Sequence, residues 1–206
     1  MKAAFQRIAG HPALDLVNTL DWRFGTREPE DLLATYSDLL RFTEQSGLLT
    51  AKQARPLRHM PGARALDRSR DLRETLAAIL YARLDGQNPP PSSLAALERF
   101  FQAARAAEKL RWKQGRLEWE WNEGGAELPL RALALSASTL MLSGDLERVR
   151  ACNNPECRWL FLDTSKNHTR RWCDMKLCGN RMKARRFKAQ RKGRENGSPL
   201  DGLPEL

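Results

Sequence analysis

The segments Cys152-Asn-Asn-Pro-Glu-Cys157 and Cys173-Asp-Met-Lys-Leu-Cys178 contain all four cysteines of the 206-residue chain. Two C-x4-C pairs separated by fifteen residues form the pattern of a tetrahedral zinc site. Thiolates are soft ligands that suit zinc, and four of them leave no coordination position for a substrate or an activated water. The sequence therefore predicts one structural Zn²⁺, held by Cys152, Cys157, Cys173 and Cys178.

The segment between the two cysteine pairs predicts a small finger. A β-prone run at 158–163 precedes a polar turn at 164–168 and the short segment 169–172, and the last cysteine opens a helix-like run. A knuckle, a hairpin and a helix that carries the last ligand describe a treble-clef-like zinc finger. So short a segment has little core of its own, so metal binding is expected to supply most of its folding free energy, on the order of 10 kcal/mol. Its expected core consists of Trp159, Phe161, Trp172 and Phe187.

Disulfides are the alternative use of four cysteines, in an oxidising compartment. Residues 1–10 lack the continuous apolar run of a signal peptide. The longest apolar stretch, 128–142, contains Pro129 and Arg131 and is too short to span a bilayer. We therefore favour metal over disulfides, and expect a cytoplasmic protein that associates with the nucleoid in a bacterium and has no membrane partner.

Basic residues are concentrated in the same part of the chain. Residues 158–194 contain thirteen Lys and Arg and two acids, a net charge of +11, and the other 22 basic and 23 acidic residues give −1. Such an asymmetry indicates a polyanion partner, and nucleic acid is the most common one. The residues expected to contact it are Arg170, Arg171, Lys176, Asn180, Arg181, Lys183, Arg185, Arg186, Lys188, Arg191 and Lys192.

The basic run leaves alternatives open. Its cations suit phosphate contacts from a groove, with Asn180, Arg181 or Gln190 reaching base edges of duplex DNA. RNA or a ribosome is the second partner class, disfavoured because no aromatic stacking platform is evident. A solvated, charged helix without a partner is the third. Arg181 could also pair with Asp163 or Asp174, and Asn180 could bind backbone groups near the metal.

Residues 11–150 are expected to be mostly helical. Apolar periodicity and turn residues predict helices over 12–20, from Pro29 to about Ser46, from Thr50, over 61–84, from about residue 93 to Lys109, and over 128–142 and 145–150. The fold class is thus α+β, with a predominantly helical N-terminal domain, one β-hairpin and the C-terminal zinc finger.

The hairpin is predicted by residues 109–120. A two-residue turn at Gln114-Gly115 sets a register that places Leu and Trp on one face and mostly opposite-charge pairs on the other. The resulting cross-strand pairs are Lys113–Arg116, Trp112–Leu117, Arg111–Glu118, Leu110–Trp119 and Lys109–Glu120.

Near the N-terminus, short polar side chains share one face of the expected first helix. They are candidates for the lining of a pocket for a small-molecule effector, together with two neighbours. The favoured alternative is a buried network that caps nearby backbone groups. The five residues are Asp15, Asn18, Thr19, Trp22 and Arg23.

An enzyme is not expected, and no catalytic residue is assigned. The sequence offers no nucleophile–base pair, phosphate-binding loop or open metal site. His168 has no second histidine or carboxylate cluster near it that could hold a catalytic metal, so we interpret it as a loop residue.

Two motifs resemble a known family. Cys178-Gly-Asn-Arg181, with its paired C-x4-C arms, resembles the CGNR zinc-finger family of bacterial proteins. The segment Gly10-His-Pro-Ala-Leu-Asp-Leu-Val-Asn-Thr19 is similar to the opening signature of the ABATE domain, which accompanies that finger. Together they cover nearly the full chain. The resemblance implies a stress-induced transcription regulator, with a sensory helical α+β domain and a treble-clef finger that binds DNA.

These observations combine into one expected organisation. An ABATE-like domain at 1–148 senses a ligand or mediates assembly, a CGNR finger with its basic helix occupies 149–194, and 195–206 form a flexible tail. A homodimer is expected because two half-sites multiply the limited specificity of a single small finger.

Overall fold

The computed structural model describes residues 4–122 and 124–195. Of the expected tail, all residues after Glu195 lie outside this part of the chain. The first half of the chain contains α1 (Pro12–Val17), β1 (Leu20–Asp21), β2 (Glu30–Asp31), α2 (Tyr36–Gln45), α3 (Ala51–Ala54), the 3₁₀ turn η1 (Arg55–His59), α4 (Ala63–Leu84) and α5 (Pro91–Ala106). The second half contains β3 (Glu108–Lys113), β4 (Arg116–Trp121), α6 (Leu128–Met141), the 3₁₀ turn η2 (Gly144–Arg148), β5 (Val149–Ala151), β6 (Leu160–Leu162), the π-helical turn η3 (Met175–Gly179) and α7 (Asn180–Glu195).

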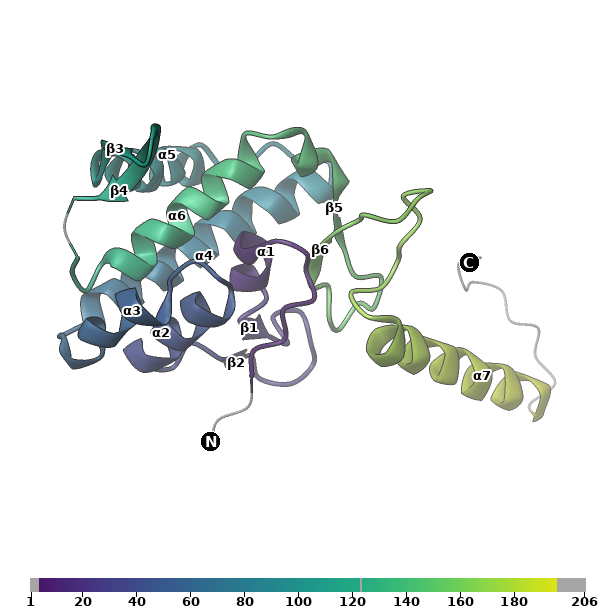
Figure 1. The fold of residues 1–206 in the computed structure, drawn as a ribbon. Coiled ribbons are helices and arrows are strands. Elements are labelled where there is room, and N and C mark those ends of the chain that lie inside the picture. Colours follow the sequence, from purple (N-terminus) through teal and green to yellow (C-terminus); the bar gives the residue numbers. More distant parts are fainter. Residues whose placement is uncertain (1–3, 123, 196–206) are drawn as a thin grey trace.

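Helices α4, α5 and α6 pack side by side and form the body of the molecule, with α1 and α2 against them (Figure 1). Each contributes an apolar stripe at helical spacing, and in α4 the buried stripe includes Leu72, Leu76, Ile79 and Leu80. The finger extends from one end of this body, and α7 points away from it (Figure 1). Among the described residues, no helix combines the length and apolar character that a membrane crossing needs.

The helix expected from Pro29 begins later, at Tyr36. Thr35 and Asp38 form a capping box, in which each side chain accepts a hydrogen bond from the other's backbone N–H. This cap satisfies donors at the start of the helix, whereas residues 30–31 pair with β1 instead. The expected first helix also ends early, at Val17, so Leu20 lies in β1 rather than on a helix.

The predicted β-hairpin is confirmed in every pair of its register. β3 and β4 are antiparallel, with Trp112 opposite Leu117 and Arg111 opposite Glu118. Gln114 and Gly115 both have positive φ angles, 45° and 82°, as a two-residue turn that follows the strand twist requires. The agreement follows because the register depends only on the local alternation of side chains and on the turn.

The strand pairing in the finger differs from the expected one. β6 pairs with β5, which precedes the first cysteine, and not with 169–172. As a consequence, residues 149–150 are strand rather than the end of a helix at 145–150. The pairing is reinforced from the body, because the Leu162 N–H donates to the Ala9 carbonyl at 2.7 Å.

The finger is attached to the body through buried contacts. The Asn18 side chain binds both backbone groups of Leu160: its amide donates to the Leu160 carbonyl, and its oxygen accepts from the Leu160 N–H, both at 2.9 Å. The Trp159 indole donates to Asp21 at 3.0 Å, and the Tyr81 hydroxyl donates to the Arg158 carbonyl at 2.9 Å. Leu160 also belongs to the main hydrophobic core, so the two segments share one interior.

Replacing Asn18 by alanine should test this attachment. Because Asn18→Ala leaves a buried N–H and a buried carbonyl of Leu160 without these partners, we expect a loss of about 2 to 4 kcal/mol in the free energy of unfolding. Denaturant unfolding with zinc present measures it. The exposed Asn167→Ala is the matched control and should change stability by less than about 0.5 kcal/mol. Equal effects in the two variants would contradict the role of Asn18.

Candidate metal centre and nucleic-acid interface

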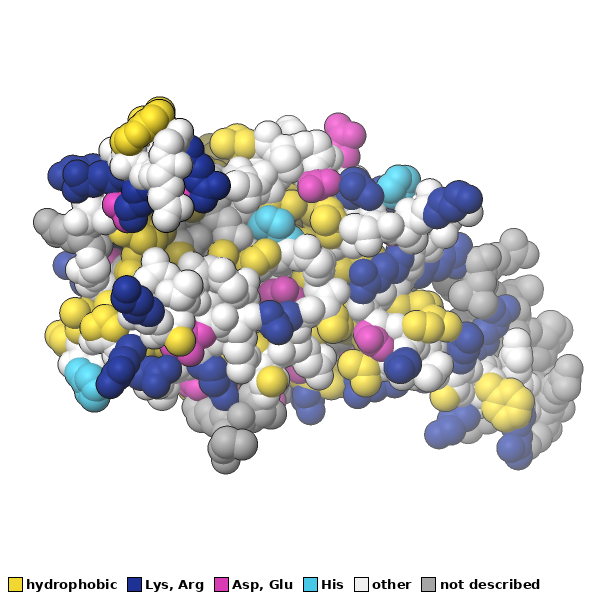
Figure 2. Space-filling model, viewed as in Figure 1, with side chains coloured by type: hydrophobic (Ala, Val, Ile, Leu, Met, Phe, Trp, Pro, Cys, Tyr) yellow, Lys and Arg dark blue, Asp and Glu magenta, His cyan; other side chains and the backbone are white. Residues whose placement is uncertain are grey.

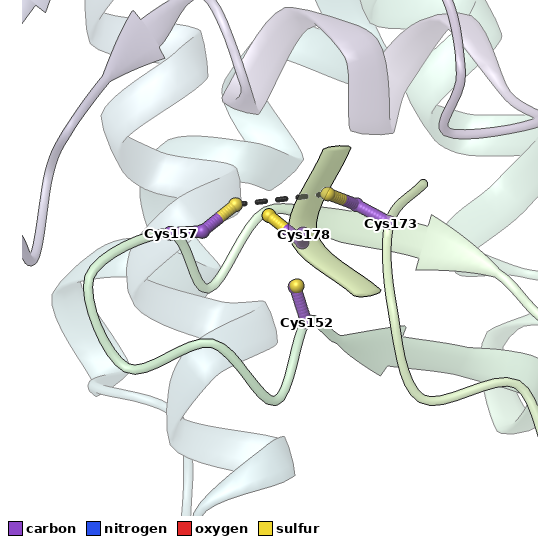
Figure 3. A group of neighbouring side chains, drawn as sticks. All are labelled: Cys152, Cys157, Cys173 and Cys178. Atoms are coloured by element: carbon purple, nitrogen blue, oxygen red, sulfur yellow. Dashed lines mark hydrogen bonds between the residues drawn. The ribbon is translucent and has the colours of Figure 1, made fainter. Parts of the chain in front are cut away.

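Four cysteine sulfurs meet at one point beside the body. Cys152 follows β5, Cys157 ends the turn that follows it, Cys173 lies in the loop before η3, and Cys178 lies in η3 (Figure 3). All four sulfur atoms lie within 4.8 Å of one another, and those of Cys157 and Cys173 are 3.7 Å apart. A tetrahedron of sulfurs around zinc has edges of about 3.8 Å, so these residues fit a closed four-thiolate site.

The four thiols perturb one another's pKa values. Hydrogen bonding with Cys152 and the other two sulfurs raises the pKa of the Cys157 thiol well above its usual range. The same kind of hydrogen bonding lowers the pKa of the Cys178 thiol far below its usual range. Protons and sulfur charge are thus shared within one cluster, and a divalent cation would replace those protons and balance four thiolates.

Asn154 organises the turn between the first two ligands. It is buried, and its carbonyl accepts the N–H groups of Cys157 and Arg158 at 2.9 and 3.0 Å. Its side-chain amide donates to the Cys178 sulfur at 3.6 Å. Such an N–H to sulfur bond stabilises a thiolate and orients it toward the metal. Asn154 is a functional residue that was not predicted, and the signal in the sequence that could have identified it is its position inside the first C-x4-C loop.

The core of the finger is shared with the N-terminal segment. Cys152, Cys173, Cys178, Trp159 and Phe161 form a buried cluster, against which Ile8 and Trp172 pack. The expectation that Phe187 completes this core is wrong, because Phe187 is 61% exposed. It lies on α7, which extends away from the finger, so Ile8 supplies apolar contact from the opposite end of the chain.

Arg170 is one of the expected nucleic-acid contacts, but its guanidinium binds backbone groups within the protein. Its guanidinium donates to the carbonyls of Trp172, Ile8 and Cys173, at 3.0 Å to Trp172 and 3.3 Å to Ile8. It also lies 4.3 Å from the centre of the Phe161 ring. These bonds tie the loop before Cys173 to the N-terminal segment, and we assign Arg170 to that structural role.

The other expected nucleic-acid contacts lie on the surface of the finger and of α7. Figure 2 shows dark blue side chains gathered over this end of the molecule. Those with exposed side chains are Arg171, Lys176, Asn180, Arg181, Lys183, Arg185, Arg186, Lys188 and Arg191. The Lys192 side chain lies outside the described part of the structure.

Helical spacing aligns some of these cations along α7. Arg181, Arg185 and Lys188 follow one another at i, i+4 and i+7, so they share one face. Arg185 forms an ion pair at 2.8 Å with Glu156, which lies in the turn between Cys152 and Cys157, so this face of α7 contacts the loop that carries two of the metal ligands. Among the described residues, none is within hydrogen-bond or ion-pair distance of the Asn180 or Arg181 side chains. This finding does not support the alternative in which these two side chains hold the fold of the finger together.

All five candidate pocket residues make contacts with other residues of the chain. The Asp15 carboxylate accepts the Ala9 N–H at 3.0 Å, and the Thr19 hydroxyl donates to Leu16 at 2.6 Å. Burial raises the pKa of Asp15 to about 6, even though the Ala9 hydrogen bond opposes that rise. With Asn18 committed to β6, these bonds favour the buried-network alternative for the first three residues.

Trp22 and Arg23 lie in the turn after β1. The Arg23 guanidinium pairs with Glu74 of α4, and Arg27 lies 3.6 Å from the centre of the Trp22 ring. A surface hollow of about 600 Å³ lies elsewhere, lined by Ile8 and residues 169–175. None of the five candidate residues lines that hollow.

Loss of one ligand should empty the metal site. In Cys173→Ser three thiolates remain, and a hydroxyl is a poor zinc ligand, so we expect zinc content to fall from one per chain to a small fraction. Elemental analysis of the purified variant measures this, and the finger should lose its protection from hydrogen exchange at the same time. Full zinc occupancy in the variant would contradict the four-thiolate assignment.

The hydrogen bond from Asn154 to the Cys178 sulfur can be tested with a matched pair of alanine variants. Asn154→Ala keeps all four thiols but removes the donor to Cys178, so we expect zinc affinity to fall about 10- to 100-fold, as measured by competition with a chelator. Asn153 is exposed, and its side chain makes no such bond, so Asn153→Ala should bind zinc like the unaltered chain. A similar loss of zinc affinity in both variants would contradict the role of the Asn154 amide and would assign the effect to the turn as a whole.

Comparison with known families matches the chain along most of its length. Residues 10–144 match ABATE, described as "Putative stress-induced transcription regulator", and residues 148–191 match the CGNR zinc finger. Neither description is that of an enzyme class. No curated protein matches the chain. The four clustered cysteines and the matched finger together give one structural zinc site. The chain belongs to the ABATE family and carries a CGNR zinc finger after the ABATE domain.

Proposed function

We propose that this zinc-dependent regulator is a cytoplasmic protein that binds duplex DNA with α7 and the adjoining finger. The observation that carries the proposal is the exposure of a row of cations on a helix whose first turn is joined to the metal ligands. A helix this basic repels itself in isolation, and a phosphate backbone relieves that repulsion. The ABATE domain is proposed to sense a ligand or to mediate assembly.

The zinc site supports this function by fixing the start of α7. Cys178 lies in η3, one residue before Gly179 and two before the helix begins, so its position determines where α7 starts. Asp174 caps the same turn, since its carboxylate accepts the Leu177 N–H at 2.9 Å. The ion pair between Arg185 and Glu156 adds a second contact between α7 and the loop of the first two ligands. A helix held in this way presents its cations to DNA with little loss of conformational entropy.

Side chains at the start of α7 are suited to base contacts. Asn180 and Arg181 are exposed and are not used by the described part of the fold. Asparagine pairs with the edge of adenine and arginine with that of guanine in the major groove, whereas lysines further along contact phosphates. We propose these two residues as the sequence-reading positions.

The ABATE domain is connected to the finger by α1. Helix α1 packs against α4, α6 and β6, and Asn18 at its end holds Leu160 in β6. A ligand that moves α1 would therefore also move a strand of the finger. This connection supports a sensory role for the domain, because it joins the body to strand β6 of the finger through two buried hydrogen bonds.

Removing two cations from α7 should weaken DNA binding and reduce its salt dependence. Contact with about six phosphates gives a slope of about −5 for log K against log salt concentration. In Lys183→Ala/Lys188→Ala two phosphate contacts are lost, so we expect the slope to become less steep by about 2. Fluorescence polarisation with random duplex DNA over a salt series measures this.

The control removes the same charge from the other end of the molecule. Lys52 and Arg55 are exposed on α3 and η1, so Lys52→Ala/Arg55→Ala should leave the slope unchanged. If both double variants alter it equally, binding follows net charge and α7 is not the interface. Stronger competition by structured RNA than by duplex DNA would instead assign the finger to RNA.

A further inference from the structure

The hairpin β3–β4 carries an apolar face that the described fold leaves largely uncovered. Its outer half consists of two cross-strand pairs, Leu110 with Trp119 and Trp112 with Leu117. The four side chains are 49%, 55%, 70% and 57% exposed, in that order. Figure 2 shows hydrophobic side chains standing at the outer edge of this hairpin. Two tryptophans at such exposure are unusual for a surface that faces only water.

The same face is covered where it meets the body. Trp121 continues the stripe formed by Leu117 and Trp119 along β4, and it packs against the buried cluster that includes Leu128 and Leu40. The stripe therefore runs from the core outward, with its inner end buried and its outer end open. The sheet has two strands, and an isolated two-stranded hairpin gains little stability without a surface to pack on.

We propose that this apolar face binds the same face of a second copy of the chain, so that the protein forms a symmetric dimer through its hairpins. Two apolar sheet faces pack together when their charged residues lie on the outer sides. Here Arg111 and Glu118 form a cross-strand pair on the opposite face, so they would stay in water.

Charge permits this self-association at the hairpin and opposes it at the finger. Residues 108–121 contain four basic and three acidic residues, a net charge of +1 in a chain of +10. Residues 158–194 carry +11, so two copies repel each other there. The hairpin lies at the end of the molecule opposite α7 (Figure 1), and the proposed dimer keeps the two basic segments apart.

The area of the face is sufficient for a weak to moderate dimer. The four exposed side chains present about 500 Å² per chain, because a tryptophan contributes about 150 to 250 Å² when fully covered. Two copies would therefore remove about 1,000 Å² from water, and packing of the flanking residues adds to it. That total reaches the lower limit for specific protein interfaces.

The dimer is tested with the full, zinc-loaded chain in the absence of nucleic acid. Sedimentation equilibrium over a range of protein concentrations should give a mass that rises from 23.5 kDa towards twice that value. A monomer at every concentration would overturn the proposal. So would a mass that rises only after nucleic acid is added, because the polymer and not the hairpin would then join the copies.

A matched pair of variants identifies the face. Trp112→Thr/Leu117→Thr replaces one apolar cross-strand pair and should raise the dissociation constant of the dimer at least about 100-fold. Arg111→Thr/Glu118→Thr replaces the neighbouring pair on the charged face and should leave it unchanged. Equal effects of the two variants, or none in either, would overturn the proposal.

Two further measurements separate the interface from hairpin stability. Hydrogen exchange over residues 108–121 reports whether each variant keeps the hairpin, and threonine favours strand structure. The single variant Leu117→Thr keeps both tryptophans and should raise the dissociation constant about 10-fold with hairpin protection intact. An unchanged dissociation constant in that variant would also count against the face. DNA affinity need not enter any of these measurements, so they are independent of the proposed function.

Discussion

Convergence of the four cysteine sulfurs on one point is the constraint on which the finger depends. The ligands come from a strand end, a turn, a loop and a π-helical turn, and these segments meet in a small buried cluster. A metal ion that binds all four replaces the extended core that so short a segment lacks. The start of α7, and hence the direction of its cations, follows from the position of Cys178. The placement of the exposed cations on α7 therefore depends on the buried cysteine cluster.

The finger also depends on the body of the protein. Asn18 satisfies both backbone groups of Leu160, Ile8 adds apolar contact to the sulfur cluster, and Arg170 joins the N-terminal segment to the loop before Cys173. These contacts join residues about 140 to 160 positions apart in the chain. Metal coordination and the hydrophobic core are thus coupled through a few residues near the N-terminus.

Features that depend on local patterns could be predicted from the sequence. The ligand set follows from cysteine spacing, and the hairpin register follows from side-chain alternation around Gln114-Gly115. Features that depend on distant partners could not. Phe187 is apolar, but its burial depends on where α7 points, and Arg170 has a charge like its neighbours but bonds to the carbonyl of Ile8. The helix predicted to begin at Pro29 begins at Tyr36 instead. Proline is common in the first turn of a helix, but the capping box at Thr35 determines where α2 begins.

The shared strands have a consequence for dissection of the protein. The family matches meet between residues 144 and 148, which invites the chain to be cut there. Val149, Leu160 and Leu162 all belong to the main core, so an N-terminal fragment that ends at the cut would have a hole in its interior. The other fragment would lack Ile8 and the bond from Asn18. We therefore expect neither fragment to fold as it does in the intact chain, so that measurements on the isolated ABATE domain or the isolated finger would report on altered structures.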